Sequence, residues 1–384
     1  MTTSERAFDI TQDDLSSLAG RGPAFVALGE TMVRDTPADD ERLERTRQVC
    51  LSMAGSEFTL AVMLSRLGVP SSYITRVPDN PYGWMLRNIA REQGVETEQF
   101  VWAEAAEPIG RFLYEIGRTP RRGKGWYQRK YSAVSKLGRG MVDWESALQN
   151  ARLFHTSGIT FGLSTHSGYE RNYLLEAFEE AVEAKPLDCL VGLDFNYRGT
   201  LWSPEQCRRT MTPLVGEHVD VLITTIEDMA KIYGMGCGGV SADDIYKGNL
   251  GDLTDDDLRG FMRELINQFD LRVVGVTVRY PDSHERHRWE SAAMDAEGRF
   301  FRSHDVREIV LRDRLGGGDT WNGGFYYGLL TASDESAIRK GVLVGDAATR
   351  LKQTLMYDLP IVTKQEIQAR MRADIEGGGK RTAR

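Results

Sequence analysis

From residue 24 onward, short apolar runs rich in β-branched residues alternate with segments of helical periodicity. The runs lie at 24–29, 72–77, 152–158, 188–196, 220–225 and 272–278, and helical patterns at 56–68, 167–184, 204–215, 226–234 and 255–269 separate most of them. Strands joined by crossover helices pair in parallel, with helices covering both faces of the sheet. The sequence therefore predicts an α/β fold built on a doubly wound, mostly parallel sheet.

Two segments, at about 30–50 and 107–132, interrupt this alternation. The first is charged and weakly patterned, whereas the second has aromatic-rich runs joined by the turn-prone stretch RTPRRGKG. We interpret them as a small sheet over one end of the main domain, a candidate lid. The expected organisation is a loosely held N-terminal extension at 1–22, one domain at 23–374, and a flexible tail at 375–384.

Composition excludes several classes of function. The 384 residues carry a formal net charge of -8, and their basic residues are interspersed with acidic ones, so we expect no nucleic-acid partner. The four cysteines show no zinc-binding spacing. No apolar run reaches the roughly 18 residues of a membrane span, and no signal peptide is evident at the start. We expect a cytoplasmic protein with no membrane partner.

The stretch DRLGGGD, residues 313–319, places three consecutive glycines before an acidic residue and the apolar run TWNGGFYYGLL. Glycine lets backbone amides come close to a ligand, and a helix that begins here would direct free N–H groups at one point. Such a site suits a phosphate or a developing negative charge. Taken alone, the stretch is equally consistent with a glycine turn followed by an N-capping Asp319.

Several motifs resemble those of the ribokinase-like, pfkB-type carbohydrate kinases. DRLGGGDTWNGGFYYGLL is similar to the family motif D-T-x-G-A-G-D, and GSEFTLAVMLSRLG and HTSGITFGLS match motifs nearer the N-terminus. DFNYRGTLW resembles the D-x-N-x-R-x-x-L-W of the 2-keto-3-deoxygluconate kinase branch. The resemblance covers roughly residues 24–370. It implies a three-layer α/β/α sandwich with a small β-sheet lid.

The resemblance also implies a catalytic arrangement. Asp319 would accept the proton of the substrate hydroxyl, and the amides of Gly316, Gly317 and Gly318 would form the anion hole. Phosphoryl transfer requires such positioning and charge stabilisation more than covalent participation by the enzyme.

For the substrate, the resemblance points to Gly55, Tyr127, Arg129 and Arg198. A keto-deoxy sugar acid carries a carboxylate, which a guanidinium can bind with two hydrogen bonds. Arg198 and Arg129 are therefore the expected partners of that group. Tyr127 would contact the sugar from the lid, and Gly55 would let the sugar approach the first helix.

ATP and Mg²⁺ are the implied cofactors. Thr277 and Arg279, together with Gly316 and Gly318, would line the nucleotide site, and Asp228 would reach the metal through water. The chain departs from the family at three positions: Ala54 replaces a glycine, and Thr59 and Thr225 each replace an asparagine.

We therefore expect an ATP-dependent kinase for the terminal hydroxyl of 2-keto-3-deoxygluconate or a related sugar acid. One alternative is a fructokinase-like enzyme for a neutral sugar. Another is a sugar-binding sensor without catalytic activity, which the replacement of family asparagines by Thr59 and Thr225 suggests. The exposed edges and aromatic residues of the lid strands also suggest a homodimer formed through the lid.

Overall fold

The computed structural model describes residues 8–20, 22–281, 283, 285–303, 307–332 and 336–375. Residues 1–7 of the expected extension and residues 376–384 of the expected tail lie outside this range. No helix among the described residues is long and apolar enough to cross a membrane.

Over the described residues, the main sheet has ten strands in the order β15-β14-β13-β12-β11-β10-β1-β4-β6, with β16 paired to β14. The parallel strands are β1 (Phe25–Leu28), β4 (Ser71–Ile74), β6 (Val95–Glu96), β10 (Leu153–Ser157), β11 (Leu190–Asp194), β12 (Val221–Thr224) and β13 (Val273–Pro281). One edge is antiparallel and consists of β14 (Arg286–Asp295), β15 (Phe300–Arg302) and β16 (Arg307–Val310). The sequence pattern predicted these parallel strands except β6, and it missed the antiparallel edge.

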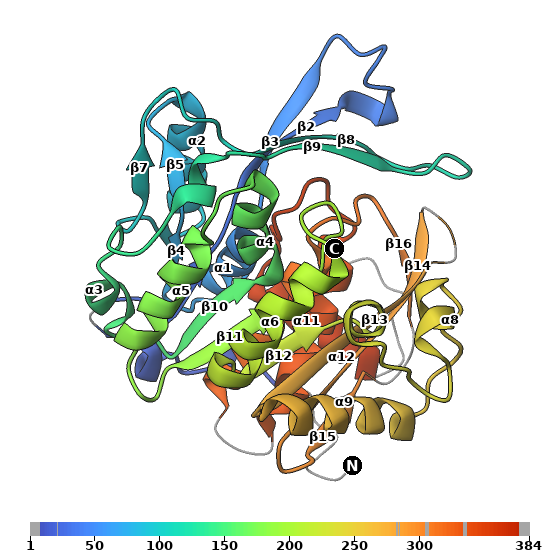
Figure 1. The fold of residues 1–384 in the computed structure, drawn as a ribbon. Helices are drawn as coiled ribbons and strands as arrows, with labels where there is room; N and C mark the ends of the chain where they lie inside the picture. The colour runs from blue at the N-terminus through green and yellow to red at the C-terminus, as the bar shows by residue number, and fades with distance from the viewer. Residues whose placement is uncertain are drawn as a thin grey trace.

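Alternate side chains of the central strand β1 enter different hydrophobic cores, which gives the molecule three layers. Phe25 and Ala27 pack in one core, and Val26 and Leu28 in the other. One face is covered by α1 (Ser56–Arg66), α2 (Pro81–Glu92), α10 (Gly317–Thr331), α11 (Ser336–Lys352) and α12 (Lys364–Ile375). The other is covered by α3 (Trp144–Leu148), α4 (Gly158–Ser167), α5 (Tyr173–Ala184), α6 (Pro204–His218), α7 (Ile226–Tyr233), α8 (Ala242–Tyr246) and α9 (Asp255–Phe269) (Figure 1). The predicted α/β/α sandwich is confirmed.

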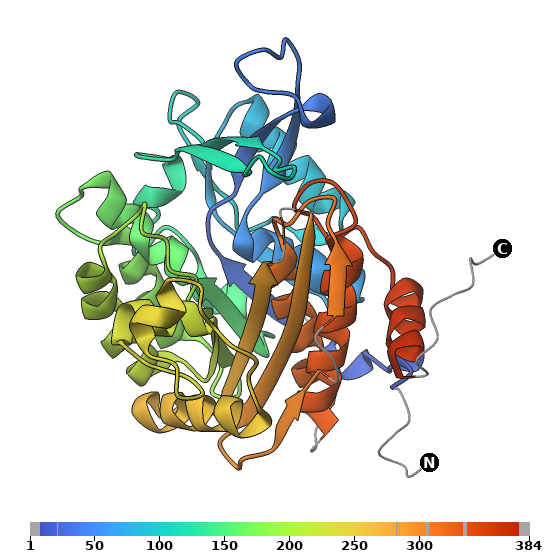
Figure 2. The ribbon, with the colours of Figure 1, turned by 90° about the vertical axis from the view of Figure 1, so that its right-hand side faces the viewer.

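A second, four-stranded sheet lies above the main sheet in both ribbon views (Figures 1 and 2). Its order is β3-β2-β8-β9, from β2 (Met32–Pro37), β3 (Val49–Ala54), β8 (Arg111–Glu115) and β9 (Lys124–Gln128). Both interrupting segments contribute to it, and β8 and β9 pair in antiparallel fashion as predicted. We refer to these four strands as the lid. A separate pair, β5 (Arg76–Pro78) and β7 (Val101–Ala103), was not predicted.

The described part of the N-terminal extension is packed against the domain, so the expectation of a loose segment is wrong for it. Ile10 is fully buried, and its amide donates to the side chain of Gln368 on α12 at 2.8 Å. The Tyr327 hydroxyl donates to Asp13 at 2.5 Å, and Lys340 pairs with the same carboxylate at 2.8 Å. These long-range contacts leave no local signal in the sequence.

Glycines also allow α10 and α11 to pack at close range. A Cβ atom at Gly328 would lie 2.2 Å from the Gly341 amide nitrogen, and one at Gly324 would lie 2.5 Å from the Gly345 Cα. Neither position has room for a side chain. This packing holds the start of α10, which carries Asp319, against the body of the domain.

The lid is tied to the loop before α10 by a buried arginine. Arg34 of β2 is inaccessible to solvent, and its guanidinium pairs with Asp313 at 2.5 Å and with Asp358 at 2.7 Å. Its Cζ atom also lies 4.8 Å from the centroid of the Tyr114 ring on β8. Since Asp313 starts the DRLGGGD stretch, this cluster joins the lid to the glycine loop.

We expect Arg34→Met to destabilise the protein by about 3–5 kcal/mol, because it removes the guanidinium that pairs with two buried carboxylates and leaves excess negative charge there. Urea unfolding measures the change in free energy. Arg42→Met is the matched control: Arg42 is 51% exposed and lies 3.5 Å from Glu115, so its loss should cost at most about 1 kcal/mol. Equal losses for the two variants would contradict this account of the lid attachment.

Candidate active site

Two adjoining cavities, of about 490 and 290 Å³, open at the carboxyl ends of the parallel strands beneath the lid. Ligands of open α/β sheets bind at this edge. The two cavities share part of their lining: Tyr127, Asn196, Arg198, Leu315, Gly316 and Asp319. Asp319 therefore lies where the cavities meet. We call the larger the phosphate-side cavity and the smaller the sugar-side cavity.

Packing leaves no room for a side chain at two of the three loop glycines, Gly316 and Gly317. Gly316 is the N-cap of α10 with φ 75°, and a Cβ there would lie 2.3 Å from the Asp358 carbonyl oxygen. At Gly317 a Cβ would lie 2.4 Å from the side chain of Gln353, whereas at Gly318 no atom lies within 4 Å. The helix begins at Gly317, so two of the glycines belong to its first turn rather than preceding it as expected.

Backbone amides of this loop are left without acceptors. Within the described part of the chain, no hydrogen bond joins the amides of Gly316, Gly317, Gly318 or Asp319 to a protein acceptor, and the first helical bond is from Thr320 N to Gly316 O at 3.0 Å. All four residues line the phosphate-side cavity. The loop therefore presents unpaired donors and the positive end of the α10 dipole to that cavity.

The Asp319 carboxylate is held by a residue that the motif analysis did not single out. Ser56, the first residue of α1, donates its hydroxyl to Asp319 Oδ1 at 2.5 Å. Burial raises the pKa of Asp319, while the Ser56 hydrogen bond and the charge of Arg198 oppose that rise. The carboxylate thus has a basicity above that of an ordinary aspartate and one fixed hydrogen-bond donor.

A second carboxylate, Asp194, lies at the end of β11 close to Asp319. Burial and the negative charge of Asp319 raise the pKa of Asp194 to about 8. Asn322 of α10 donates to Asp194 Oδ2 at 2.8 Å. Asp194 is the first residue of the DFNYRGTLW motif, from which only Arg198 was predicted to be a site residue. Two neighbouring carboxylates with different environments permit one to be ionised while the other holds a proton.

The two arginines expected to bind a substrate carboxylate differ in their partners. Arg198 is exposed to both cavities and pairs with no carboxylate of the described chain. Arg129 lines only the sugar-side cavity and is buried against Glu30, with Nε 2.7 Å from Oε2. Ser132 donates to the other oxygen of Glu30 at 2.6 Å. The positive charge of Arg129 is therefore already balanced by the protein.

Gly55 and Tyr127 also reach the sugar-side cavity. Tyr127 lies on β9 of the lid and stacks on Phe112 of β8, with ring centroids 5.3 Å apart. A Cβ at Gly55 would lie 2.4 Å from the carbonyl oxygen of Glu30. Packing against the chain that leads into the lid is thus sufficient reason for a glycine at this position, apart from any ligand.

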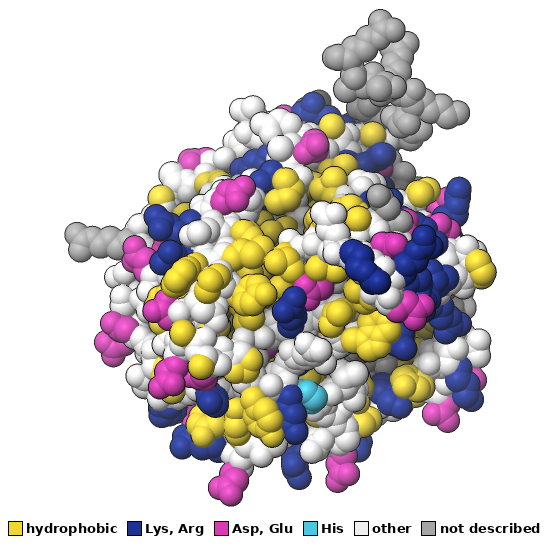
Figure 3. All heavy atoms as spheres, turned by 90° about the horizontal axis from the view of Figure 1, so that it is seen from above, with side chains coloured by type: hydrophobic (Ala, Val, Ile, Leu, Met, Phe, Trp, Pro, Cys, Tyr) yellow, Lys and Arg dark blue, Asp and Glu magenta, His cyan; other side chains and the backbone are white. Residues whose placement is uncertain are grey.

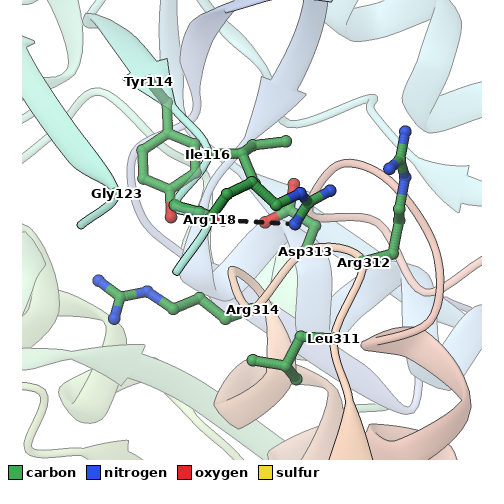
Figure 4. A pocket seen from close by; sticks show the side chains of 9 residues that line it. Tyr114, Ile116, Arg118, Gly123, Leu311, Arg312, Asp313 and Arg314 are labelled. Carbon is green, nitrogen blue, oxygen red and sulfur yellow. Dashed lines mark hydrogen bonds between the residues drawn. The ribbon is translucent and has the colours of Figure 1, made fainter. Parts of the chain in front are cut away.

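Thr277 and Arg279, in the middle and second half of β13, line the phosphate-side cavity. Arg314 of the glycine loop lines it as well, and neither arginine pairs with a carboxylate within the described residues. Figure 4 shows a smaller neighbouring pocket, in which the side chains of Arg312 and Arg314 extend to opposite sides of Asp313. Arg314 was not predicted as a site residue; it occupies the threonine position of the family motif.

The candidate metal ligand Asp228 also lines this cavity. Its Oδ2 accepts a hydrogen bond from the Tyr197 amide at 3.1 Å, and burial raises its pKa to about 6. Among the described residues, no group of three or more His, Cys, Asp or Glu side chains is arranged to hold a metal ion.

The structure shows what Thr225 and Thr59, the two residues that replace family asparagines, contact in this chain. Thr225 caps α7 by accepting a hydrogen bond from the Asp228 amide at 3.1 Å. Thr59 is fully buried in α1 and lines neither cavity, so the residue at this position is not in reach of a ligand there.

Comparisons with known proteins agree with this geometry. Residues 24–240 match the family model described as pfkB family carbohydrate kinase. The chain is 29% identical over 353 residues to a 2-dehydro-3-deoxygalactonokinase of Haloferax volcanii, covering 92% of this chain and 98% of the relative. The crystal structure of a 2-dehydro-3-deoxygluconokinase from Thermotoga maritima superposes with a TM-score of 0.80 at 30% identity, covering 91% of this chain and 99% of the other.

A putative 2-keto-3-deoxygluconate kinase from Enterococcus faecalis has the same fold, with a TM-score of 0.77 at 22% identity and coverage of 94% and 98%. The family model covers residues 24–240, and the shared fold covers 91% of the chain. Both point to the same family as the sequence motifs. The chain belongs to the pfkB family of carbohydrate kinases.

Proposed function

We propose that this kinase transfers the γ-phosphoryl group of ATP to the terminal hydroxyl of 2-keto-3-deoxygluconate or a closely related sugar acid. The observation that carries the proposal is the meeting of two cavities at Asp319, beside the unpaired amides of the glycine loop. The relatives named for 2-dehydro-3-deoxy sugar acids support the choice of substrate class.

In the proposed reaction, Asp319 takes the proton of the sugar hydroxyl as its oxygen attacks the γ-phosphorus. The bond between that phosphorus and the β–γ bridging oxygen breaks, and ADP leaves. The amides of Gly316, Gly317 and Gly318 stabilise negative charge on the transferred phosphoryl oxygens. Nearby Asp194 stays protonated at neutral pH, in keeping with its pKa of about 8.

The phosphate-side cavity fits a triphosphate. Arg279 and Arg314 bring two positive charges to it, and neither of them pairs with a carboxylate of the described chain. Thr277 lies on the same wall and would contact the nucleotide. The unpaired amides at the start of α10 complete the set of donors that phosphate oxygens require.

Magnesium would arrive with ATP, and when bound it would neutralise charge on the phosphates. Among the described residues, the carboxylate of Asp228 lines the same cavity as the glycine loop, which allows this mode of binding. Asp228 would hold a water of the hydrated ion. One of its oxygens is engaged by the Tyr197 amide at 3.1 Å, which fixes the carboxylate at the cavity wall.

For the sugar carboxylate, the unpaired Arg198 is the stronger partner. Arg129, paired with Glu30, would offer its remaining N–H groups as directional donors without net charge. Tyr127 would cover the sugar from the lid, with Gly55 at the floor of the same cavity.

We expect Arg198→Met to raise KM for 2-keto-3-deoxygluconate by about 10- to 100-fold, because the substrate carboxylate loses a charge-assisted hydrogen bond. The KM for ATP should change less. ATP consumption with 2-keto-3-deoxygluconate, 2-keto-3-deoxygalactonate, fructose and ribose measures both the preference and the change. Arg209→Met, at an exposed position of α6, is the control. If neutral sugars outcompete the sugar acids, the fructokinase-like alternative holds instead.

A pH profile tests the role of the Ser56 hydrogen bond. The Ser56 hydroxyl stabilises the ionised form of Asp319, so Ser56→Ala should raise the pKa of that carboxyl. As pH falls, the variant base is protonated earlier, and the acid limb of kcat/KM should move to higher pH while the alkaline plateau remains. Ser65→Ala, whose hydroxyl bonds Gln93 O at 2.8 Å, should leave the limb in place. An unmoved limb in Ser56→Ala would remove Asp319 as the titrating base.

We also propose a homodimer formed through the lid. Large apolar side chains are exposed on its two edge strands, including Leu51 at 42% and Trp126 at 39%. Figure 3, seen from above, shows hydrophobic side chains gathered near the middle of this face. Light scattering at micromolar concentration should give twice the mass of the chain, and Trp126→Glu should give the monomer. A monomeric wild-type protein would contradict the proposal.

A further inference from the structure

A buried lysine lies directly behind the glycine loop, on the side away from the cavities. Lys352, the last residue of α11, is inaccessible to solvent. Its Nζ donates to the carbonyl oxygen of Asp313 at 3.3 Å and to that of Leu315. One helical turn earlier, Thr349 donates its hydroxyl to the carbonyl oxygen of Gly317 at 3.0 Å.

These contacts determine where the loop amides point. In a trans peptide unit, the C=O of one residue and the N–H of the next point in opposite directions. Because the Leu315 carbonyl is drawn towards Lys352, the Gly316 N–H faces away from α11. The same holds for the Gly318 N–H, since the Gly317 carbonyl is bound by Thr349. Both glycines line the phosphate-side cavity.

The charges around Lys352 make it an internal counter-ion. Asp313 and Asp358 lie close to it and also pair with Arg34, so two cations and two carboxylates share one buried cluster. Burial lowers the pKa of Lys352, and the two carboxylates oppose that shift. Removing the ammonium would leave carbonyl oxygens and negative charge facing a space the size of a small cation.

We propose that Lys352 is a positioning residue whose ammonium group serves as a built-in monovalent cation and directs the glycine-loop amides towards the transferred phosphoryl group. The proposal rests on the proposed role of those amides as the anion hole. Since the cation is covalently part of α11, the wild-type enzyme should need no added monovalent cation. A variant without the ammonium should acquire that need.

The experiment compares wild type, Lys352→Met and Lys340→Met in potassium, ammonium, methylammonium and tetramethylammonium chlorides at one ionic strength. Lys340 is the matched control, a buried lysine of the same helix that pairs with Asp13 at 2.8 Å. We expect Lys352→Met to lose about 100-fold in kcat with a smaller change in KM, as when one anion-hole donor is removed. Potassium or ammonium should restore at least about tenfold of that loss, whereas tetramethylammonium, too large for the site, should restore none.

Melting curves in the same salts give a readout that needs no substrate. Ammonium should raise the melting temperature of Lys352→Met relative to tetramethylammonium, and it should leave wild type and Lys340→Met unchanged. If wild type phosphorylates none of the sugars, the proposed function fails. The melting curves still test whether a small cation binds in place of the Lys352 ammonium group.

Several results would overturn the proposal. One is wild-type turnover stimulated several-fold by potassium, which needs no variant to observe. Another is a folded Lys352→Met with unchanged kcat. The third is a folded but impaired variant that no small cation restores, because Lys352 would then have a packing role alone.

Discussion

The buried charge cluster of Arg34, Asp313, Lys352 and Asp358 is the interaction on which the rest of the site depends. It joins a lid strand, the glycine loop and the end of α11 in one place. Exposed ion pairs contribute little to stability, but a buried cluster cannot lose one member without leaving an uncompensated charge. The glycine loop is therefore attached to this cluster through the Asp313 side chain and the carbonyl oxygens of Asp313 and Leu315.

The distribution of charge in the cleft follows the chemistry that a sugar kinase performs. Arg279 and Arg314 face the phosphate side, where a triphosphate would bring negative charge, and Arg198 lies where the two cavities meet. Asp319 lies at the junction with the sugar side, where the proposed reaction removes a proton from a hydroxyl, and Asp194 lines the phosphate side near it. The chain has a net charge of -8, so the positive charge that these unpaired arginines bring to the cleft could not be inferred from the overall composition.

The features that were predictable from sequence are those with local patterns. Strand and helix periodicity gave the parallel sheet, and the glycine-rich stretch before an apolar helix gave the position of Asp319. Contacts between distant residues were not predictable. The pairing of Arg129 with Glu30 joins residues 99 apart, and the bonds from Lys352 to the loop carbonyls span more than thirty positions. Ser56 was missed for the same reason, because its partner is 263 residues away.

A crystal structure with ADP, Mg²⁺, aluminium fluoride and 2-keto-3-deoxygluconate tests the central claim most directly. We expect a planar fluoride group between ADP and the terminal hydroxyl, within about 3 Å of the glycine-loop amides, and a hydrogen bond between that hydroxyl and Asp319. A fluoride group bound away from the start of α10, or a terminal hydroxyl with no contact to Asp319, would contradict it.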